Sequence, residues 1–154
     1  MISIQNEDFS LGDEYAAIRR RAGDAGAIVT FTGLGREVYG DGSTAGAVQS
    51  LTLEHYPGMT EKCLKDIQQK AEQRWPLLAT RIIHRVGELT SHDQIVLVAT
   101  ASAHRHAAFE SAQFIMDYLK SEAPFWKKQK SEQGSSWIKS RDTDKAALDR
   151  WQKP

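Results

Sequence analysis

Two lysines, Lys120 and Lys127, are the side chains of this sequence best placed to do chemistry. Lys120 falls in the last turn of a helix predicted over 105–121, and Lys127 follows Pro124, which disfavours helical geometry at the residue before it. Because the chain reverses there, the two ammonium groups could converge on one pocket. A lysine beside another cation, or partly desolvated, becomes a usable base or nucleophile. The alternative is two solvated surface lysines, one of them favoured by the helix dipole.

A second group of cations, His104, Arg105 and His106, stands where a predicted strand meets the same helix. Free backbone amides at a helix N-terminus bind anions, and an arginine adds a bidentate fork for phosphate. The alternative is helix capping with solvated charge. The His-x-His spacing is typical of metal sites, but no third ligand stands nearby, so we favour anion binding and expect no metal.

Two more arginines are candidate anion contacts. Arg36 follows Gly33 and Gly35, and these glycines could let the backbone and the guanidinium group approach a phosphate. The segment is not a P-loop, since no Gly-Lys-Ser or Gly-Lys-Thr follows. Arg141 lies after a predicted hairpin and is a candidate clamp, although an exposed arginine is the simpler alternative.

Other potentially reactive side chains are predicted to be structural. The only cysteine, Cys63, falls within a helix beside Leu64 and is expected to behave as a small hydrophobe. A sulfur-carrying role would need an exposed thiolate, which nothing in its surroundings indicates. His84 alternates with Ile82 and Val86, so we predict a histidine packed within a strand.

Composition narrows the class of protein. A chain of 154 residues with 40% apolar and 26% charged residues is expected to form one domain over 1–154 with a real core. The formal net charge of +0 gives no global field to attract nucleic acid or a membrane. The first residues lack the pattern of a secretory signal, no apolar run would span a bilayer, and a single cysteine excludes a disulfide framework. We therefore expect a cytoplasmic protein.

The predicted elements position these side chains. A capping box at Ser10 indicates a first helix, and further helices are predicted over 60–75, 105–121 and 142–151. Strands are predicted over 2–5, 27–33, 48–55, 81–86 and 95–100, with a hairpin over 125–139. The segment 34–46 is rich in Gly, Ser and Asp, which predicts a mobile loop. Because the strands are not regularly interrupted by helices, the order favours an α+β fold.

Several motifs together resemble one family. They are Leu-Thr-Leu-Glu-His-Tyr-Pro-Gly-Met-Thr at 51–60, His-Arg-Val-Gly-Glu at 84–88, Ser-Ala-His-Arg at 102–105, and the run 114–127 that contains both lysines. Over about residues 9 to 151, the sequence resembles the large, catalytic subunit of molybdopterin synthase. The resemblance implies an α/β hammerhead-like fold, with a mixed, largely antiparallel sheet and flanking helices, which is compatible with the α+β prediction.

The resemblance also implies an activity and partners. Family members are sulfurtransferases of molybdenum cofactor biosynthesis, which convert cyclic pyranopterin monophosphate (precursor Z) to molybdopterin by installing two sulfurs as an ene-dithiolate. Each sulfur arrives as a thiocarboxylate on the C-terminal Gly-Gly tail of a small ubiquitin-like subunit. The family assembly is a heterotetramer with a central homodimer of the large subunit. No cofactor is implied, and an outside sulfur donor fits this chain better than a persulfide on Cys63.

Specific residues take roles through the same resemblance. Lys120 resembles the essential lysine and Lys127 its helper, near the donor tail and the substrate. The implied substrate-binding residues are Leu34, Gly35, Arg36, His104, Arg105, Lys128, Gln129 and Arg141. Gly35 stands where the family usually has valine, and the loop that follows to Val48 is longer than usual, so the resting position of Arg36 is the least constrained part of this expectation. His106 is a second, milder departure, at a position that is often a small polar residue.

The leading hypothesis is therefore that the arginines and His104 hold the pterin and its phosphate, while the lysines assist attack by the thiocarboxylate sulfur. Opening of the cyclic phosphate and elimination of water would complete each addition. Two alternatives stay open. A non-catalytic binding module for a ubiquitin-like protein would not need Lys120 or Lys127, and a pterin or nucleotide phosphate-binding enzyme without a sulfur step would act without a partner protein.

Overall fold

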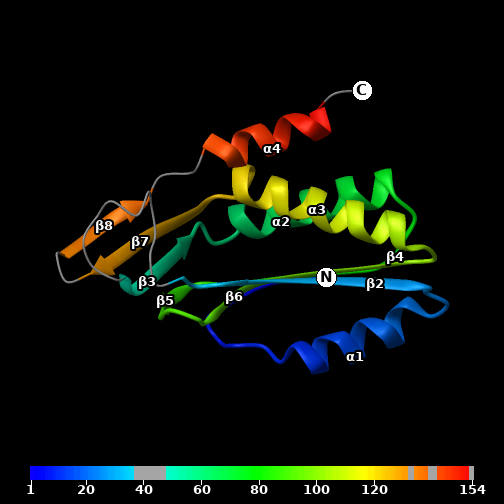
Figure 1. Cartoon of the computed structure of the whole chain (residues 1–154), viewed down its shortest axis with the longest axis horizontal. Helices are drawn as coiled ribbons and strands as arrows, with labels where there is room; N and C mark the ends of the chain where they lie inside the picture. The colour runs from blue at the N-terminus through cyan, green and yellow to red at the C-terminus, as the bar shows by residue number, and fades with distance from the viewer. Residues whose placement is uncertain (37–47, 132–133, 139–141, 153–154) are drawn as a thin grey trace.

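The computed structural model describes residues 1–36, 48–131, 134–138 and 142–152 (Figure 1). The elements in chain order are β1 (Ile2–Gln5), α1 (Leu11–Ala22), β2 (Ala27–Leu34), β3 (Val48–His55), α2 (Met59–Arg74), β4 (Leu77–Arg85), β5 (Gly87–Leu89), β6 (Gln94–Ser102), α3 (Arg105–Glu122), β7 (Phe125–Ser131), β8 (Gly134–Ile138) and α4 (Asp142–Gln152). Among these described residues, no helix is both long and apolar enough to cross a membrane.

The strands form two four-stranded sheets. The first has the order β1-β4-β6-β2, in which only the β1–β4 pair is parallel. The second has the order β5-β3-β7-β8 and is antiparallel throughout. This arrangement confirms the α+β class and the mixed, largely antiparallel pairing, but it divides the strands between two sheets.

Helices cover both faces of the first sheet. In Figure 1, α1 lies below this sheet, α2 and α3 lie above it, and α4 lies on the outer side of α3. The central strand β6 is buried without interruption from Val96 to Ser102, as expected for a strand with helices on both sides. The second sheet extends from the end of the molecule where α3 finishes (Figure 1).

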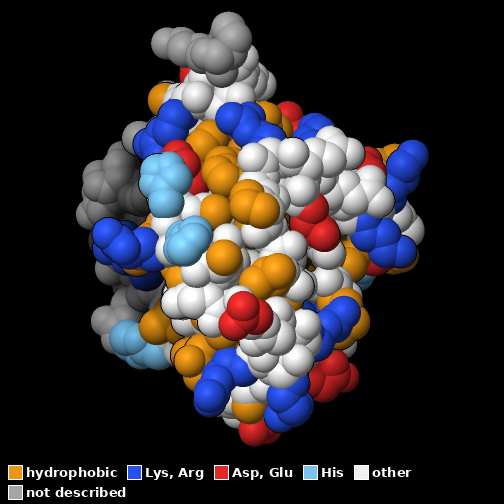
Figure 2. Space-filling view, turned by 90° about the vertical axis from the view of Figure 1, so that its right-hand side faces the viewer, with side chains coloured by type: hydrophobic (Ala, Val, Ile, Leu, Met, Phe, Trp, Pro, Cys, Tyr) orange, Lys and Arg blue, Asp and Glu red, His pale blue; other side chains and the backbone are white. Residues whose placement is uncertain are grey.

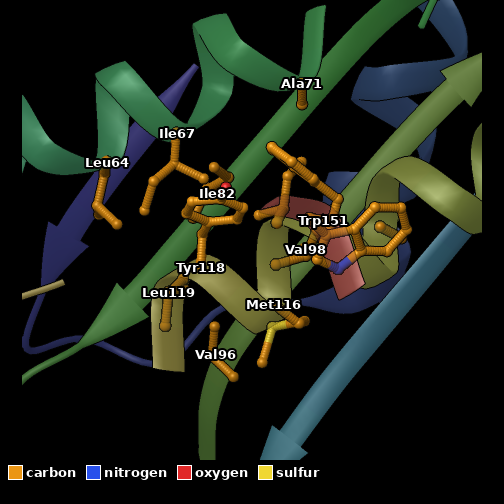
Figure 3. Close-up of a cluster of buried hydrophobic side chains, with 13 residues drawn as sticks. Leu64, Ile67, Ala71, Ile82, Val96, Val98, Met116, Tyr118, Leu119 and Trp151 are labelled. Atoms are coloured by element: carbon orange, nitrogen blue, oxygen red, sulfur yellow. The ribbon is translucent and has the colours of Figure 1, made fainter. Parts of the chain in front are cut away.

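The main core lies between α2, α3 and the first sheet (Figure 3). Its helical members include Leu64 and Ile67 from α2 and Ile115 from α3, each at most 1% exposed. Trp151 brings α4 into this core, and its indole Nε1 donates to a carboxylate oxygen of Asp117 at 2.6 Å. The helix that carries Lys120 is therefore held on several sides.

Most predicted elements are confirmed, with differences at their ends. Ser10 caps α1 by accepting a hydrogen bond from the Asp13 backbone N–H at 3.2 Å. Leu34, predicted as the first loop residue, is instead the last residue of β2. Phe109, predicted beside the apolar stripe of α3, is 63% exposed. Strand β5 was not predicted, because three residues are too few to show an alternating pattern. The rest of the predicted mobile loop, 37–46, lies outside the described residues.

Candidate active site

The turn after α3 brings Lys120 close to the second sheet. Lys120 is exposed in the last turn of the helix, and Ala123 takes the extended conformation (φ −73°, ψ 129°) that a following proline favours. The hydroxyl of Thr60, at the start of α2, donates to the Pro124 carbonyl at 3.1 Å. The reversal predicted from Pro124 is thus formed and tied to a neighbouring helix.

Strand β7, which follows this turn, has one of its two faces directed toward the first sheet. The ring of Phe125 stacks on that of His84 in β4, with centroids 3.7 Å apart and planes 13° from parallel. Side chains alternate along a strand, so Lys127 is the next residue of β7 on the face that carries Phe125. His55 of β3 is directly paired with Phe125 and therefore shares that face. Phe125, Lys127 and His55 therefore share the face of the second sheet that is turned toward His84.

The charges of both lysines act on His84. Burial, the largest cause, and the positive charges of Lys120, Lys127 and His55 together lower the pKa of His84 from 6.5 to about 3, while the hydrogen bond to the Arg85 carbonyl opposes them. His84 is 4% exposed. Its imidazole is accordingly neutral at physiological pH, and both lysine charges act on it from different elements.

An acidic side chain borders this cluster. Glu61, in the first turn of α2, lies 3.3 Å from Nε2 of His55 and also accepts a hydrogen bond from the Gly58 backbone N–H. It therefore fixes the His55 ring and places one negative charge at the edge of a cationic site. The lysines keep positive potential at the centre, which suits an anionic ligand.

Arg36 lies at the same end of the molecule as the lysines. The register of the first sheet places Gly33, Val96 and His84 in one row across β2, β6 and β4, about 10 Å from first to third strand. Gly35 is buried and fixed by two backbone hydrogen bonds, donating to Asp93 at 2.9 Å and accepting from His92 at 2.7 Å. The exposed Arg36 follows it directly, and Leu34 beside it is 51% exposed.

His104 and Arg105 lie at the opposite end of α3. His104 is the N-cap residue, but its side chain makes no capping hydrogen bond, and the first turn contains no acidic residue. These two residues, with His106, Phe109 and Glu110, line a surface hollow of about 470 Å³. Figure 2 faces this end of the molecule and shows His side chains along its left side, with Lys and Arg side chains beside them and elsewhere on this face, and exposed hydrophobic side chains between them.

The predicted residues thus form two groups within one chain. Lys120, Lys127 and Arg36 lie at one end, and His104 and Arg105 at the other. Lys120 lies fifteen positions after Arg105, and this separation spans about 22 Å of straight helix because each residue adds about 1.5 Å. The two groups are therefore separated by most of the length of α3 within one chain.

For three of the predicted substrate-binding residues, the side chain lies outside the described part of the chain. The backbones of Lys128 and Gln129 lie in β7, paired with Thr52 and Leu51 of β3, and their side chains are outside the description. Arg141 lies outside the described residues altogether. For these three, a substrate-binding role stays a prediction.

Cys63 behaves as predicted. The thiol is half-buried, and its Sγ lies 3.6 Å from the Glu122 carbonyl. Burial and the nearby charges of Glu122 and Asp66 raise the pKa of the thiol, which disfavours the nucleophilic thiolate. This environment argues against Cys63 as a sulfur carrier.

Neither His84 nor His55 was predicted to belong to the site. The prediction that His84 packs within a strand is confirmed, but its contact with Phe125 joins two sheets and has no local signature. The available signal was the presence of both histidines in the family-like motifs 51–60 and 84–88. Within the described part of the chain, no group of three or more His, Cys, Asp or Glu side chains is placed to hold a metal ion.

These features define a class of protein: an α+β chain that gathers lysines at a proline turn, where they can bind and activate an anion. A family model described as MoaE protein matches residues 4–122. The molybdopterin synthase catalytic subunit of Vibrio cholerae is 53% identical over 152 residues, which cover 98% of this chain and 97% of the relative.

Solved structures agree with this match. The molybdopterin biosynthesis MoaE protein of Burkholderia ambifaria superposes with a TM-score of 0.84 at 48% identity, covering 100% of this chain and 99% of the other. Molybdopterin synthase from Staphylococcus aureus gives a TM-score of 0.78 at 31% identity, covering 88% and 95%. The chain belongs to the MoaE family.

Proposed function

We propose that this chain is the catalytic subunit of a molybdopterin synthase, a sulfurtransferase that converts cyclic pyranopterin monophosphate to molybdopterin. The observation that carries the proposal is the turn after α3, where Phe125 stacks on the buried, neutral His84 and the charges of Lys120 and Lys127 both act on that ring. Membership of the MoaE family supplies the reaction class.

The chemistry of the substrates matches the charges. The pterin carries a cyclic phosphate and the sulfur donor is a thiocarboxylate, so both reactants are anionic and would repel each other without cations between them. Lys120 and Lys127 offset that repulsion, and one of them supplies or removes a proton as sulfur adds to the pterin carbon. Arg36, at the same end, is suited to the phosphate because its guanidinium group can bind two oxygens at once.

The sulfur donor is a second protein. We expect a small ubiquitin-like subunit whose C-terminal Gly-Gly tail enters the lysine site, since glycines let an extended backbone approach closely. The raised pKa of Cys63 supports an external donor over a persulfide on this chain. We place the reaction in the cytoplasm, and we retain 1–154 as a single catalytic domain.

The two separate cationic groups suggest that a second copy of the chain takes part. His104 and Arg105 are proposed to bind the same substrate as the lysines, yet they lie about 22 Å from Lys120 in one chain. The homodimer expected for this family offers a way to join them, if one copy contributes its lysines and the other its α3 N-terminus. The exposed hollow at His104 is compatible with such a contact.

The direct test is reconstitution. The chain is incubated with thiocarboxylated small subunit and cyclic pyranopterin monophosphate, and the dithiolene product is detected by mass spectrometry. Small subunit ending in an ordinary carboxylate is the matched control and should give no dithiolene.

The outcomes separate the alternatives. Dithiolene formed only with the thiocarboxylated partner supports the proposal. Tight binding of the partner without product, under conditions where another molybdopterin synthase turns over, would leave the non-catalytic binding module. Conversion of the pterin without any partner would instead support the enzyme lacking a sulfur step.

A further inference from the structure

Specific contacts fix the orientation of the buried His84 ring. One face of its ring stacks on Phe125, and its Nδ1 lies 2.8 Å from the Arg85 carbonyl oxygen. A carbonyl only accepts hydrogen bonds, so Nδ1 carries the proton and donates. The ring is 4% exposed, so both its orientation and its tautomer are fixed.

The other ring nitrogen is therefore an acceptor. With Nδ1 protonated and the ring neutral, Nε2 has a free lone pair in the plane of the ring. The charged groups that act on the ring are Lys120 from α3, Lys127 from β7 and His55 from β3, and Glu61 of α2 holds His55. A lysine ammonium group has three donors and no acceptor, so it is the natural partner for this nitrogen.

We propose that His84 is a positioning residue of the lysine site, whose Nε2 accepts a hydrogen bond from the ammonium group of Lys120 when the small subunit is bound. Lys120 is chosen over Lys127 because it lies in the last turn of α3, just before the Pro124 turn that brings Phe125 onto the His84 ring. This inference deepens the proposed function and rests on it.

The choice of a neutral acceptor has a chemical reason. A carboxylate at this place would form an ion pair with Lys120, cancel much of its charge and weaken its attraction for a thiocarboxylate or a phosphate. A neutral imidazole directs the ammonium group while leaving its full charge for the substrate. The desolvated ring cannot take up the proton itself, because burial opposes a third positive charge beside the two lysines.

The test is a substitution series at His84 in the complex with thiocarboxylated small subunit. His84→Phe keeps a ring that can stack on Phe125 but removes both nitrogens, and His84→Gln supplies an amide oxygen near the place of Nε2. Ile82→Val, a buried change in the same strand, is the control for effects of stability alone. The readouts are kcat, KM for the pterin, the pH dependence of kcat and Tm.

We expect His84→Phe to lower kcat about tenfold or more, with KM changed less than about twofold, as for loss of a hydrogen bond to a charged group. The alkaline limb of its pH profile should move to lower pH, because the ammonium form loses an acceptor. His84→Gln should recover part of kcat, and Ile82→Val should keep both the wild-type rate and profile. A kcat and profile that stay at wild-type values in His84→Phe would overturn the proposal.

Two further results separate the possible failures. A wild-type chain that makes no dithiolene rejects the proposed function itself, whereas normal wild-type turnover with an unaffected His84→Phe rejects only the role of His84. If His84→Phe does not fold, the ¹⁵N resonance of His84 Nε2 is compared between the wild-type and Lys120→Met complexes. A shift in that resonance is expected, and an unchanged resonance would overturn the proposal.

Discussion

The two ends of α3 carry cations in opposite settings. At the C-terminal end, Lys120 lies beside a buried histidine, a stacked phenylalanine and a turn bonded to α2. At the N-terminal end, His104 and Arg105 are exposed, and no side chain caps the helix. The first end is therefore organised by its own chain, and the second presents its charges to the outside.

The helix dipole sharpens this contrast. A cation in the last turn is favoured by the partial negative charge there, whereas cations in the first turn are disfavoured. Acidic residues stand in the first turn of α1, at Asp13 and Glu14, and of α2, at Glu61, but none does in α3. Arg105 therefore gains nothing from the dipole, which favours a binding role over a stabilising one.

The largest expected effect is at the lysine end. Lys120→Ala should lower kcat for dithiolene formation about 100-fold or more, the range for loss of a positioned proton-transfer group. Binding of the small subunit, followed by calorimetry, should change little. Lys65→Ala, at an exposed lysine of α2, is the matched control and should keep the wild-type rate. Normal turnover by Lys120→Ala would show that the lysine at the C-terminal end of α3 is not needed for catalysis.

A change at the other end should act on binding. Arg105→Ala should raise KM for the pterin about tenfold to 100-fold, as for loss of a charge-assisted hydrogen bond, with a smaller effect on kcat. Arg20→Ala, an exposed arginine of α1, is the control. Steady-state kinetics with saturating small subunit measures both constants.

Mixing these two variants tests whether the ends meet between copies. If one copy supplies the lysines and another Arg105, a mixture of Lys120→Ala and Arg105→Ala chains should regain part of the activity that each lacks alone. A mixture no more active than the average of its components would show that the two ends do not share a site.

The middle of α3 should affect stability more than chemistry. Asp117 accepts from Trp151 at 2.6 Å and from Gln113 at 2.8 Å, so it anchors α4 on α3. Asp117→Ala leaves the indole N–H of Trp151 without this acceptor and should lower the free energy of unfolding by about 1–3 kcal/mol. Urea denaturation measures the change, and Gln113→Ala, at an exposed side chain, should cost less. Equal losses in the two variants would argue against the anchoring role.

The buried His84 should make the stability of the chain depend on pH. The pKa of His84 falls from 6.5 to about 3 on folding, so between these values the unfolded chain binds more protons than the native one. Stability from this group is thus present above pH 6.5 and is lost as the pH falls toward 3, by at most about 1.4 kcal/mol per pH unit. Across this range, the free energy of unfolding measured with urea should depend less steeply on pH in His84→Phe than in the wild type.

The smallest expected effect is at Cys63. Its raised pKa and half-buried position predict slow alkylation by iodoacetamide at neutral pH. Cys63→Ala should keep kcat within about twofold of wild type. Loss of dithiolene formation in this variant would instead support a sulfur-carrying role for Cys63.

Local rules account for what the sequence determined by itself. The apolar stripe of α3, the cap of α1 at Ser10 and the reversal at Pro124 follow from interactions within a few residues, and all three are formed. The same local patterns gave the strands of the hairpin β7–β8 and placed Lys120 and Lys127 on either side of one turn. The family resemblance added the reaction class that spacing alone left open.

Tertiary structure decided what surrounds the lysines. Contact between Phe125 and His84 joins residues 41 positions apart in two different sheets, so no local pattern could reveal it. The rigidity of α3 likewise separates Arg105 from Lys120, although both were predicted to serve one ligand. The sequence specifies the type of each side chain and its neighbours along the chain. Which distant groups surround that side chain depends on how the sheets and helices pack.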